Sequence, residues 1–299
     1  MSSKVPAGSL AERLRLFLPT VYKKYGALNA RQYAYRAEAA KALKKSRTTF
    51  NQVNRILVEL REQGVLPWNA VLDSSRDFSP LLRDDSPESF ILRERAKFVR
   101  LAEAYYVPKW RGQPIVPVLI TEKEGLIPYF ETTTQEWDVS IYPIKGQAGK
   151  SHLHANFRPW AIRVLQEHEE LRVIYLGDYD DEGFQIEQTL NETLASFGVP
   201  IETVRLALTK ELVEQQGIEL EPCNPKSSIS GKFVEGKAEL EALEPTLLTQ
   251  LVEEAIRECI DEEILADSES AEPSEQDEAR KTIKKLTGNK NLFPALNSQ

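Results

Sequence analysis

The chain has few of the residues that build disulfide or zinc sites, and it lacks long hydrophobic runs. Its 299 residues include two cysteines, Cys223 and Cys259, and three histidines. Neither cysteine has a close partner in sequence, so a disulfide framework or a paired-cysteine zinc site is not supported. Apolar stretches such as IVPVLI at 115–120 are much shorter than the roughly 18 residues of a membrane span, and residues 1–10 show no signal-peptide core. We therefore expect a cytoplasmic protein that does not enter a membrane.

Charge is distributed unevenly along the chain. The composition, 41% hydrophobic and 28% charged, is typical of a globular protein, and the length is enough for two domains. The net charge is −8, yet residues 1–61 contain 13 Lys or Arg against 3 Asp or Glu, and residues 251–278 contain 1 against 12. A basic helical segment is the usual footprint of a phosphate-binding module, although such a segment is also often a solvated helix face.

Hydrophobic spacing predicts helices between residues 10 and 64. Apolar residues recur at helical intervals over 10–17, 33–43 and 50–60. We expect Asn29 to cap the second helix, Ser46 or Thr48 to cap the third, and Gly64 to end it. The segment LPWNAVLDSS at 66–75 then has strand-like apolar positions. Helices followed by a small β element predict a winged-helix domain over residues 1–75.

The sequence pattern changes after a charged connector at 76–112, in which one helix is expected over 88–106. From residue 113 onward, segments rich in β-branched and aliphatic residues alternate with helical segments. This alternation predicts an α/β domain over 113–265, with a mostly parallel, Rossmann-like sheet and a last helix near 246–264. Residues 266–299 include an acidic stretch with serine and proline, and we expect a flexible tail there.

Carboxylates are expected to meet at one edge of the predicted sheet. Asp178 ends the strand RVIYLGD, Asp180 follows it, and Gly183 permits a tight turn into the next helix. Glu122 lies at the end of the strand VPVLITEK, and ligands bind at the carboxyl ends of parallel strands. Oxygen-rich clusters of this kind suit Mg²⁺. The alternative is an acidic loop that caps the next helix, with its charge favoured by the helix dipole.

A strand-end Glu followed by a D-x-D-x-x-G turn resembles the Toprim domain of topoisomerases, primases and certain nucleases, over roughly residues 113–210. The resemblance implies that Asp178 and Asp180 bind magnesium. It also implies that Glu122 binds the ion or acts as a general acid or base at the sugar oxygen. Asp181 departs from the pattern, because many Toprim sequences have proline or another residue at this position.

The stretch ARQYAYR at 30–36 resembles the winged-helix segment of the topoisomerase VI A subunit and its meiotic relative, in which a tyrosine attacks DNA. On this match Arg31 and Tyr35 correspond, while Ala34 precedes the tyrosine and the aromatic Tyr33 comes one place early. The order of winged helix and then Toprim is also the order in that family. Arg31, one helical turn before Tyr35, is placed to stabilise phenolate or phosphate. The other interpretation is that these tyrosines are ordinary core or surface residues of an amphipathic helix.

Residues 46–78 and the stretch ELEALEP at 239–245 resemble a group of bacterial and phage proteins similar to that subunit. Asp73 and Arg76 belong to this pattern. We interpret them as a salt-bridged joint between domains rather than as catalytic residues.

These resemblances predict a magnesium-dependent enzyme that acts on the phosphodiester backbone of double-stranded DNA. In one version Tyr35 cleaves DNA by transesterification, as a topoisomerase does. In another, water is the nucleophile and the protein is a Toprim nuclease. A third possibility is a DNA-binding or assembly protein with an inactive Toprim site. The resemblance also implies a homodimer and a separate ATPase subunit, because nothing in this chain looks like an ATPase.

Overall fold

The computed structural model describes residues 9–44, 46–72, 86–101, 104–144, 149–198, 201–223 and 236–287. The chain divides into two compact units, Met1–Arg76 with Pro114–Cys259, and Asp77–Gln113 with Ile260–Gln299. The first unit therefore contains both the N-terminal helices and the α/β segment. Helices and a parallel sheet confirm the predicted α/β class. Asp73 and Arg76 lie outside the described residues.

The N-terminal part of the first unit is built from α1 (Leu10–Tyr25), α2 (Ala30–Ala39) and α3 (Arg47–Glu62). Capping boxes begin each helix, and the predicted caps are confirmed at Asn29 for α2 and at Ser46 for α3. Gly64 follows the end of α3 with a φ of +71°, a conformation that glycine adopts without a steric penalty. Local sequence therefore determines where these helices begin and end.

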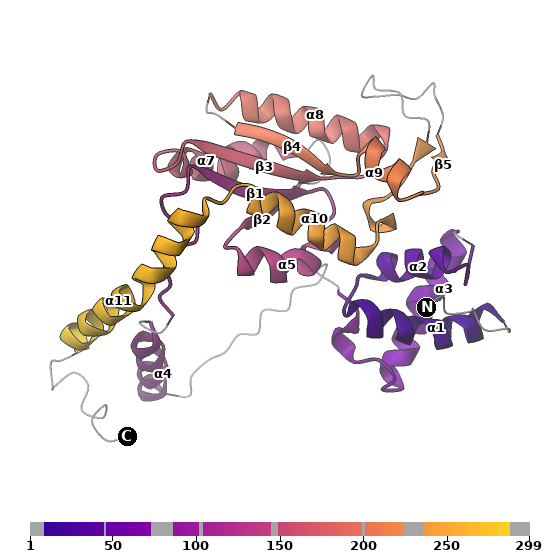
Figure 1. Ribbon diagram of the computed structural model, residues 1–299. Coiled ribbons are helices and arrows are strands. Elements are labelled where there is room, and N and C mark those ends of the chain that lie inside the picture. The colour runs from indigo at the N-terminus through magenta and orange to yellow at the C-terminus, as the bar shows by residue number, and fades with distance from the viewer. Residues whose placement is uncertain are drawn as a thin grey trace. The chain divides into compact units, whose positions relative to one another are not determined.

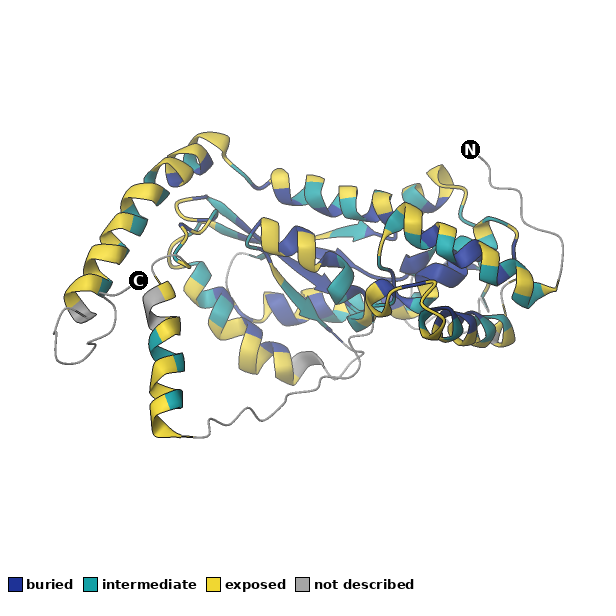
Figure 2. Cartoon of the chain, turned by 90° about the horizontal axis from the view of Figure 1, so that it is seen from below, coloured by how far each residue is buried: buried dark blue, intermediate teal, exposed yellow. Residues whose placement is uncertain are grey.

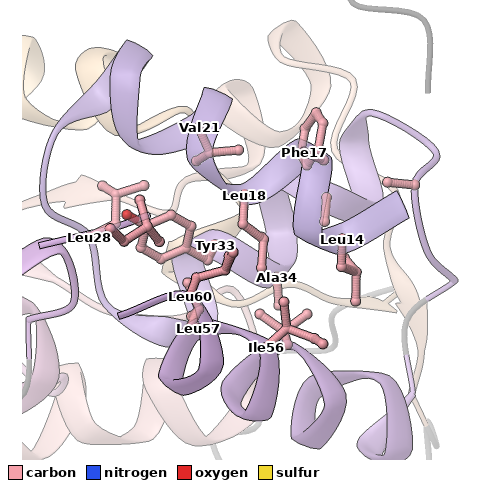
Figure 3. Close-up of a cluster of buried hydrophobic side chains, with 14 of the residues drawn as sticks. Leu14, Phe17, Leu18, Val21, Leu28, Tyr33, Ala34, Ile56, Leu57 and Leu60 are labelled. Carbon is pink, nitrogen blue, oxygen red and sulfur yellow. The ribbon is translucent and has the colours of Figure 1, made fainter. Parts of the chain in front are cut away.

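A cluster of buried aliphatic and aromatic side chains holds the three helices together (Figure 3). Leu14 and Leu18 of α1, Tyr33 of α2, and Ile56 and Leu57 of α3 are at most 1% exposed. Burying a large apolar side chain contributes about 1.5–3 kcal/mol, so this cluster dominates the stability of the segment. The Tyr33 hydroxyl donates to the Ala70 carbonyl at 3.1 Å, which identifies Tyr33 as a core residue.

The strand expected over 66–75 is wrong for residues 68–70, which form the 3₁₀ turn η1 (Trp68–Ala70). Within the described residues 66–72, the strand pairing is one isolated parallel bridge between Leu28 and Val71. Pro67 precedes the turn and has no N–H to donate to a β-ladder. Residues 73–75 lie outside the described part of the chain.

The α/β part of the first unit contains four parallel strands in the order β2-β1-β3-β4. All four were predicted from their β-branched and aliphatic residues, and they span β1 (Ile115–Thr121), β2 (Ser140–Pro143), β3 (Glu170–Leu176) and β4 (Ile201–Ala207). The central strands β1 and β3 are almost entirely buried, as is usual for a parallel sheet covered on both faces. Thr121 lies opposite Leu176, so the two central strands end side by side.

Helices cover both faces of this sheet. Figure 1 shows α8 (Asp181–Ala195) on one face, and α5 (Ile127–Glu136) and α10 (Pro245–Arg257) on the other. The remaining described elements of this part are short: η2 (Glu124–Leu126), α6 (Gly149–His152), the π-turn η4 (Leu153–Phe157), α7 (Arg158–Val164), α9 (Lys210–Gln215), β5 (Glu221–Pro222), β6 (Gly236–Lys237) and η6 (Leu240–Ala242).

The second unit contains α4 (Pro87–Arg100) and α11 (Glu262–Thr287), and Figure 2 shows both helices largely exposed. The helix expected near 246–264 is confirmed at 246–257 as part of α10, but it does not continue to 264, because the chain leaves the helical conformation at 258–261. The Asp261 carboxylate accepts the N–H groups of Glu263 and Ile264 at 3.0 and 3.3 Å, and so begins a new helix.

Residues 266–287 are helical rather than a flexible tail, which corrects a third expectation. Acidic side chains of α11 find partners in the segment before β1. The Arg111 guanidinium donates to both Glu275 oxygens at 2.8 and 2.9 Å, and the Val107 N–H donates to Glu272 at 3.1 Å. Composition alone does not reveal such tertiary partners.

Candidate functional site

The carboxyl ends of β1 and β3 bring Glu122 and Asp178 together. The Asp178 N–H donates to Glu122 Oε1 at 2.8 Å, and the Glu122 N–H donates to the Leu176 carbonyl at 3.4 Å. The hydroxyl of Tyr175, a fully buried residue of β3, lies 3.4 Å from Glu122 Oε2 and 3.2 Å from the Gly183 carbonyl, both of which are acceptors. Glu122, Asp178 and Asp180 are called the acidic edge below.

Asp180 and Gly183 shape the turn between β3 and α8. Asp180 is the N-cap of α8, and its Oδ1 accepts the Gly183 N–H at 2.7 Å. A Cβ atom at position 183 would lie 2.5 Å from the Asp178 carbonyl oxygen, closer than real Cβ contacts, so the turn requires glycine. The expected capping role of this acidic loop is thus present at Asp180. Because Oδ1 of Asp180 makes the cap, Oδ2 is the oxygen that Asp180 could offer to a metal ion.

Arg205 of β4 fixes the backbone of this turn, although the sequence did not single it out. Its side chain is 9% exposed and pairs with Glu187 of α8 at 2.8 Å. The guanidinium also donates to the carbonyls of Asp178 and Leu208. It lies 4.2 Å from the ring centroid of Phe184, a cation–π contact. Arg205 therefore holds the backbone of Asp178 in place.

Lys123 and Glu241 adjoin the acidic edge and were not predicted. The Lys123 Nζ lies 2.7 Å from Asp178 Oδ2 and 3.5 Å from Oε2 of Glu241, whose side chain is 3% exposed. The Leu240 N–H donates to Asp178 Oδ1 at 2.7 Å, so both Asp178 oxygens have partners. Lys123 is adjacent in sequence to Glu122, and Glu241 lies within ELEALEP, but no local spacing joins residues 123 and 241.

Burial and neighbouring charges shift several pKa values at this site. Desolvation and the Asp178 charge raise the pKa of Glu122 to about 7, against the opposing effects of the Asp178 N–H and Lys123. Burial also raises the pKa of Glu241, and Lys123 opposes that shift. Burial alone would lower the pKa of Lys123, but the charges of Glu241 and Asp178 outweigh it and raise the pKa. Lys123 therefore stays an ammonium at neutral pH.

The chemistry of the donor set fits a hard divalent cation. Glu122, Asp178 and Asp180 offer carboxylate oxygens, which Mg²⁺ prefers together with water. Among the described residues, no three His, Cys, Asp or Glu side chains are already grouped as ligands. Among the described residues, buried Oε2 of Glu241 has only the ion pair with Lys123 and accepts no hydrogen bond, and the single ammonium of Lys123 faces both Asp178 and Glu241. A bound cation would offset this excess negative charge.

Arg31 and Tyr35 of α2 do not join the acidic edge directly but contact the segment next to it. We call residues 238–243 the bridging segment. Arg31 Nη1 lies 2.9 Å from Glu239 Oε2, and the charge of the Glu239 carboxylate also acts on the Tyr35 hydroxyl, whose pKa it helps to raise. Ala238 exchanges backbone hydrogen bonds with Tyr179 at 2.9 and 3.0 Å. The predicted nucleophile and the acidic edge are therefore joined through a short stretch of backbone.

The Tyr35 side chain is buried in this arrangement. It is 6% exposed, and its ring packs edge-on against Phe50 with the centroids 5.9 Å apart. Burial, and then the negative charges of Glu239 and Glu241, raise the pKa of the Tyr35 hydroxyl above its usual value. The hydroxyl is therefore protonated and shielded here.

No protein-family model, curated protein or solved structure matches this chain. Among the described helices, none is long and apolar enough to cross a membrane. Functional assignment therefore depends on the geometry of the acidic edge and of the residues around it.

Proposed function

We propose that this protein is a magnesium-dependent enzyme that acts on the phosphodiester backbone of double-stranded DNA, in the manner of the topoisomerase VI A subunit. The observation that carries the proposal is the contact between Glu122 and Asp178 at the ends of adjacent parallel strands, beside a turn that requires Gly183. Carboxylates at this place in an α/β sheet suit metal-assisted chemistry on phosphates.

The exposed face of α3 supports DNA as the substrate. Thr48, Asn51, Asn54 and Arg55 are exposed on this helix, while its other face lies in the core. Asn and Arg are the residue types that most often read base edges in the major groove, and Arg also neutralises phosphates. A basic helical segment therefore presents suitable chemistry to a duplex.

In the proposed reaction, the Tyr35 oxygen attacks the phosphorus atom and the bond from phosphorus to the 3′ oxygen breaks. The phenol proton leaves to water, and the 3′ oxygen takes up a proton. Glu122, with a pKa of about 7, is suited to donate that proton. When bound, magnesium supplies positive charge that stabilises the phosphate and the leaving oxygen. The products are a tyrosyl 5′-phosphate and a free 3′ hydroxyl.

A Toprim nuclease with water as the nucleophile is the second candidate. The burial of the Tyr35 hydroxyl and its raised pKa favour this alternative. Both candidates use the acidic edge, and they differ in whether protein becomes attached to DNA. For the topoisomerase version, a homodimer supplies one site per strand, and an ATPase subunit drives strand passage.

The test is incubation of the full chain with supercoiled plasmid and magnesium, followed by denaturation with and without protease. The variants are Asp178→Asn, which keeps an acceptor for the Leu240 N–H, and Tyr35→Phe, which removes one hydroxyl. Glu182→Gln, an exposed carboxylate in the same turn, is the matched control. Circular dichroism shows whether each variant is folded.

We expect protein-linked breaks with the wild type and Glu182→Gln, and a loss of at least about 100-fold in the other two variants. Free breaks lost in Asp178→Asn alone would establish the nuclease. DNA binding without cleavage by any form would contradict both enzymatic versions and leave a binding or assembly role.

A further inference from the structure

The Glu239 carboxylate lies against the face of α2 that carries Arg31 and, one helical turn later, Tyr35. Arg31 binds it at 2.9 Å, and its charge also acts on the Tyr35 hydroxyl. We propose that Arg31 and Tyr35 form a phosphate-binding site and that the Glu239 carboxylate occupies this site in the DNA-free protein. The inference rests on the proposed function, because it assigns the DNA phosphate as the ligand that replaces Glu239.

The groups around Glu239 are those that bind a phosphate. A guanidinium presents planar N–H donors that match carboxylate and phosphate oxygens alike, and a phenol adds a further donor. Arg31 has a half-exposed side chain, and that of Glu239 is 34% exposed, so an external anion can reach this pair. A carboxylate in this position therefore stands in for the non-bridging oxygens of a phosphate.

The charge of Glu239 opposes the reaction that Tyr35 would perform. A negative charge beside a phenol disfavours loss of the phenol proton, so Glu239 keeps Tyr35 in its neutral form. Its negative charge also contributes to the raised pKa of Tyr35. Replacement of Glu239 by phosphate places the phosphorus atom beside the tyrosine oxygen and leaves Arg31 to bind the incoming anion.

The bridging segment connects this exchange to the acidic edge. Arg36 of α2 donates to the carbonyls of Ala242 and Leu243 at 2.6 and 2.9 Å, which anchors one end of the segment. The neighbours of Glu239 are Ala238, paired with Tyr179, and Leu240, whose N–H binds Asp178. A phosphate that displaces Glu239 from Arg31 therefore moves a residue whose neighbour, Leu240, binds the predicted metal ligand Asp178.

The experiment compares Glu239→Gln with Glu59→Gln as a matched control. Glu59 also pairs with an arginine, Arg15, at 2.9 Å, and its side chain is 30% exposed. Each substitution removes one negative charge that is paired with an arginine of the N-terminal helices. Glu59→Gln frees Arg15, whereas Glu239→Gln frees Arg31. Binding of the full chain to a fluorescent DNA duplex is measured by anisotropy at low salt. Glu239→Gln should bind about tenfold more tightly than the wild type, and Glu59→Gln within about twofold.

The gain should disappear when Glu239→Gln is combined with Arg31→Ala. An equal gain in both Gln variants, or a gain that persists without Arg31, would overturn the proposal. A second measurement does not depend on DNA: the NMR signal of the Arg31 side-chain N–H is followed during titration with inorganic phosphate, with Arg31→Ala supplying the assignment.

Phosphate should shift this signal at lower concentration in Glu239→Gln than in the wild type or Glu59→Gln. If the shift occurs but no form binds duplex DNA, the phosphate site stands and DNA is the wrong substrate. If all three proteins respond to phosphate alike, Glu239 does not occupy a phosphate site at Arg31, whatever the DNA experiments show.

Discussion

Glu122 lies half-buried between Asp178 and Tyr175, and desolvation together with the Asp178 charge raises its carboxyl pKa from 4.5 to about 7. A raised carboxyl pKa means that folding favours the protonated form. Its contribution to stability is therefore present below pH 4.5 and is lost as the pH rises through 7. Without divalent cations, the unfolding free energy of the wild type relative to Glu122→Gln should fall by at most about 3 kcal/mol between pH 4.5 and 8. Urea denaturation at several pH values measures this difference.

Magnesium provides the control for this prediction. At pH 8 the added ion should raise the melting temperature of the wild type and of Glu182→Gln, an exposed neighbour of the acidic edge. It should leave Glu122→Gln unchanged, because that variant has lost a ligand charge. A stability difference that stays constant with pH would show that Glu122 titrates as an ordinary carboxyl group.

The turn between β3 and α8 is the element on which the acidic edge depends. In Gly183→Ala the new methyl group would lie 2.5 Å from the Asp178 carbonyl, so the turn must open. We expect a loss of about 1–3 kcal/mol in unfolding free energy from this overpacking, and a loss of the magnesium-induced rise in melting temperature. Thermal unfolding with and without magnesium measures both effects.

Gly125→Ala is the matched control, because the nearest atom to a Cβ there is 4.0 Å away. It should keep the magnesium response. A normal response in Gly183→Ala would show that the spacing of Asp178 and Asp180 does not need this tight turn.

Elements are also the scale at which the sequence was most informative. The strands were predictable because β-branched residues cluster in short segments, and the caps at Asn29 and Ser46 because each depends on residues within one helical turn. Glu122 and Asp178 were expected at strand ends. Their contact also needed β1 to pair with β3, and that is a tertiary fact.

Interactions between distant segments were not predictable. Lys123 with Glu241 and Arg31 with Glu239 each join residues more than one hundred positions apart, and neither partner carries a local signal for the other. The helix α11 was missed for a related reason. Its acidic composition suggested disorder, whereas Arg111 and the Val107 N–H supply partners that composition does not show.

Charge separation along the chain is a property of the whole molecule, and it gives the last prediction. Arg55 is exposed on α3 in the basic N-terminal segment, and Lys281 is exposed on α11 near the acidic segment. Each substitution, Arg55→Ala or Lys281→Ala, removes one exposed positive charge and leaves the same net charge. If α3 faces the DNA, Arg55→Ala alone should weaken duplex binding and reduce the slope of log K against log salt by about 1.

If the duplex contacts the protein through α3 alone, Lys281→Ala should keep the wild-type affinity and slope, because a side chain that touches no phosphate releases no counterion. Anisotropy titrations between low and moderate salt give both slopes. Equal losses in the two variants would mean that the protein attracts DNA through its overall field rather than through α3. A larger loss in Lys281→Ala would transfer the DNA-binding surface to the second unit, and the N-terminal helices would then need another partner for their positive charge.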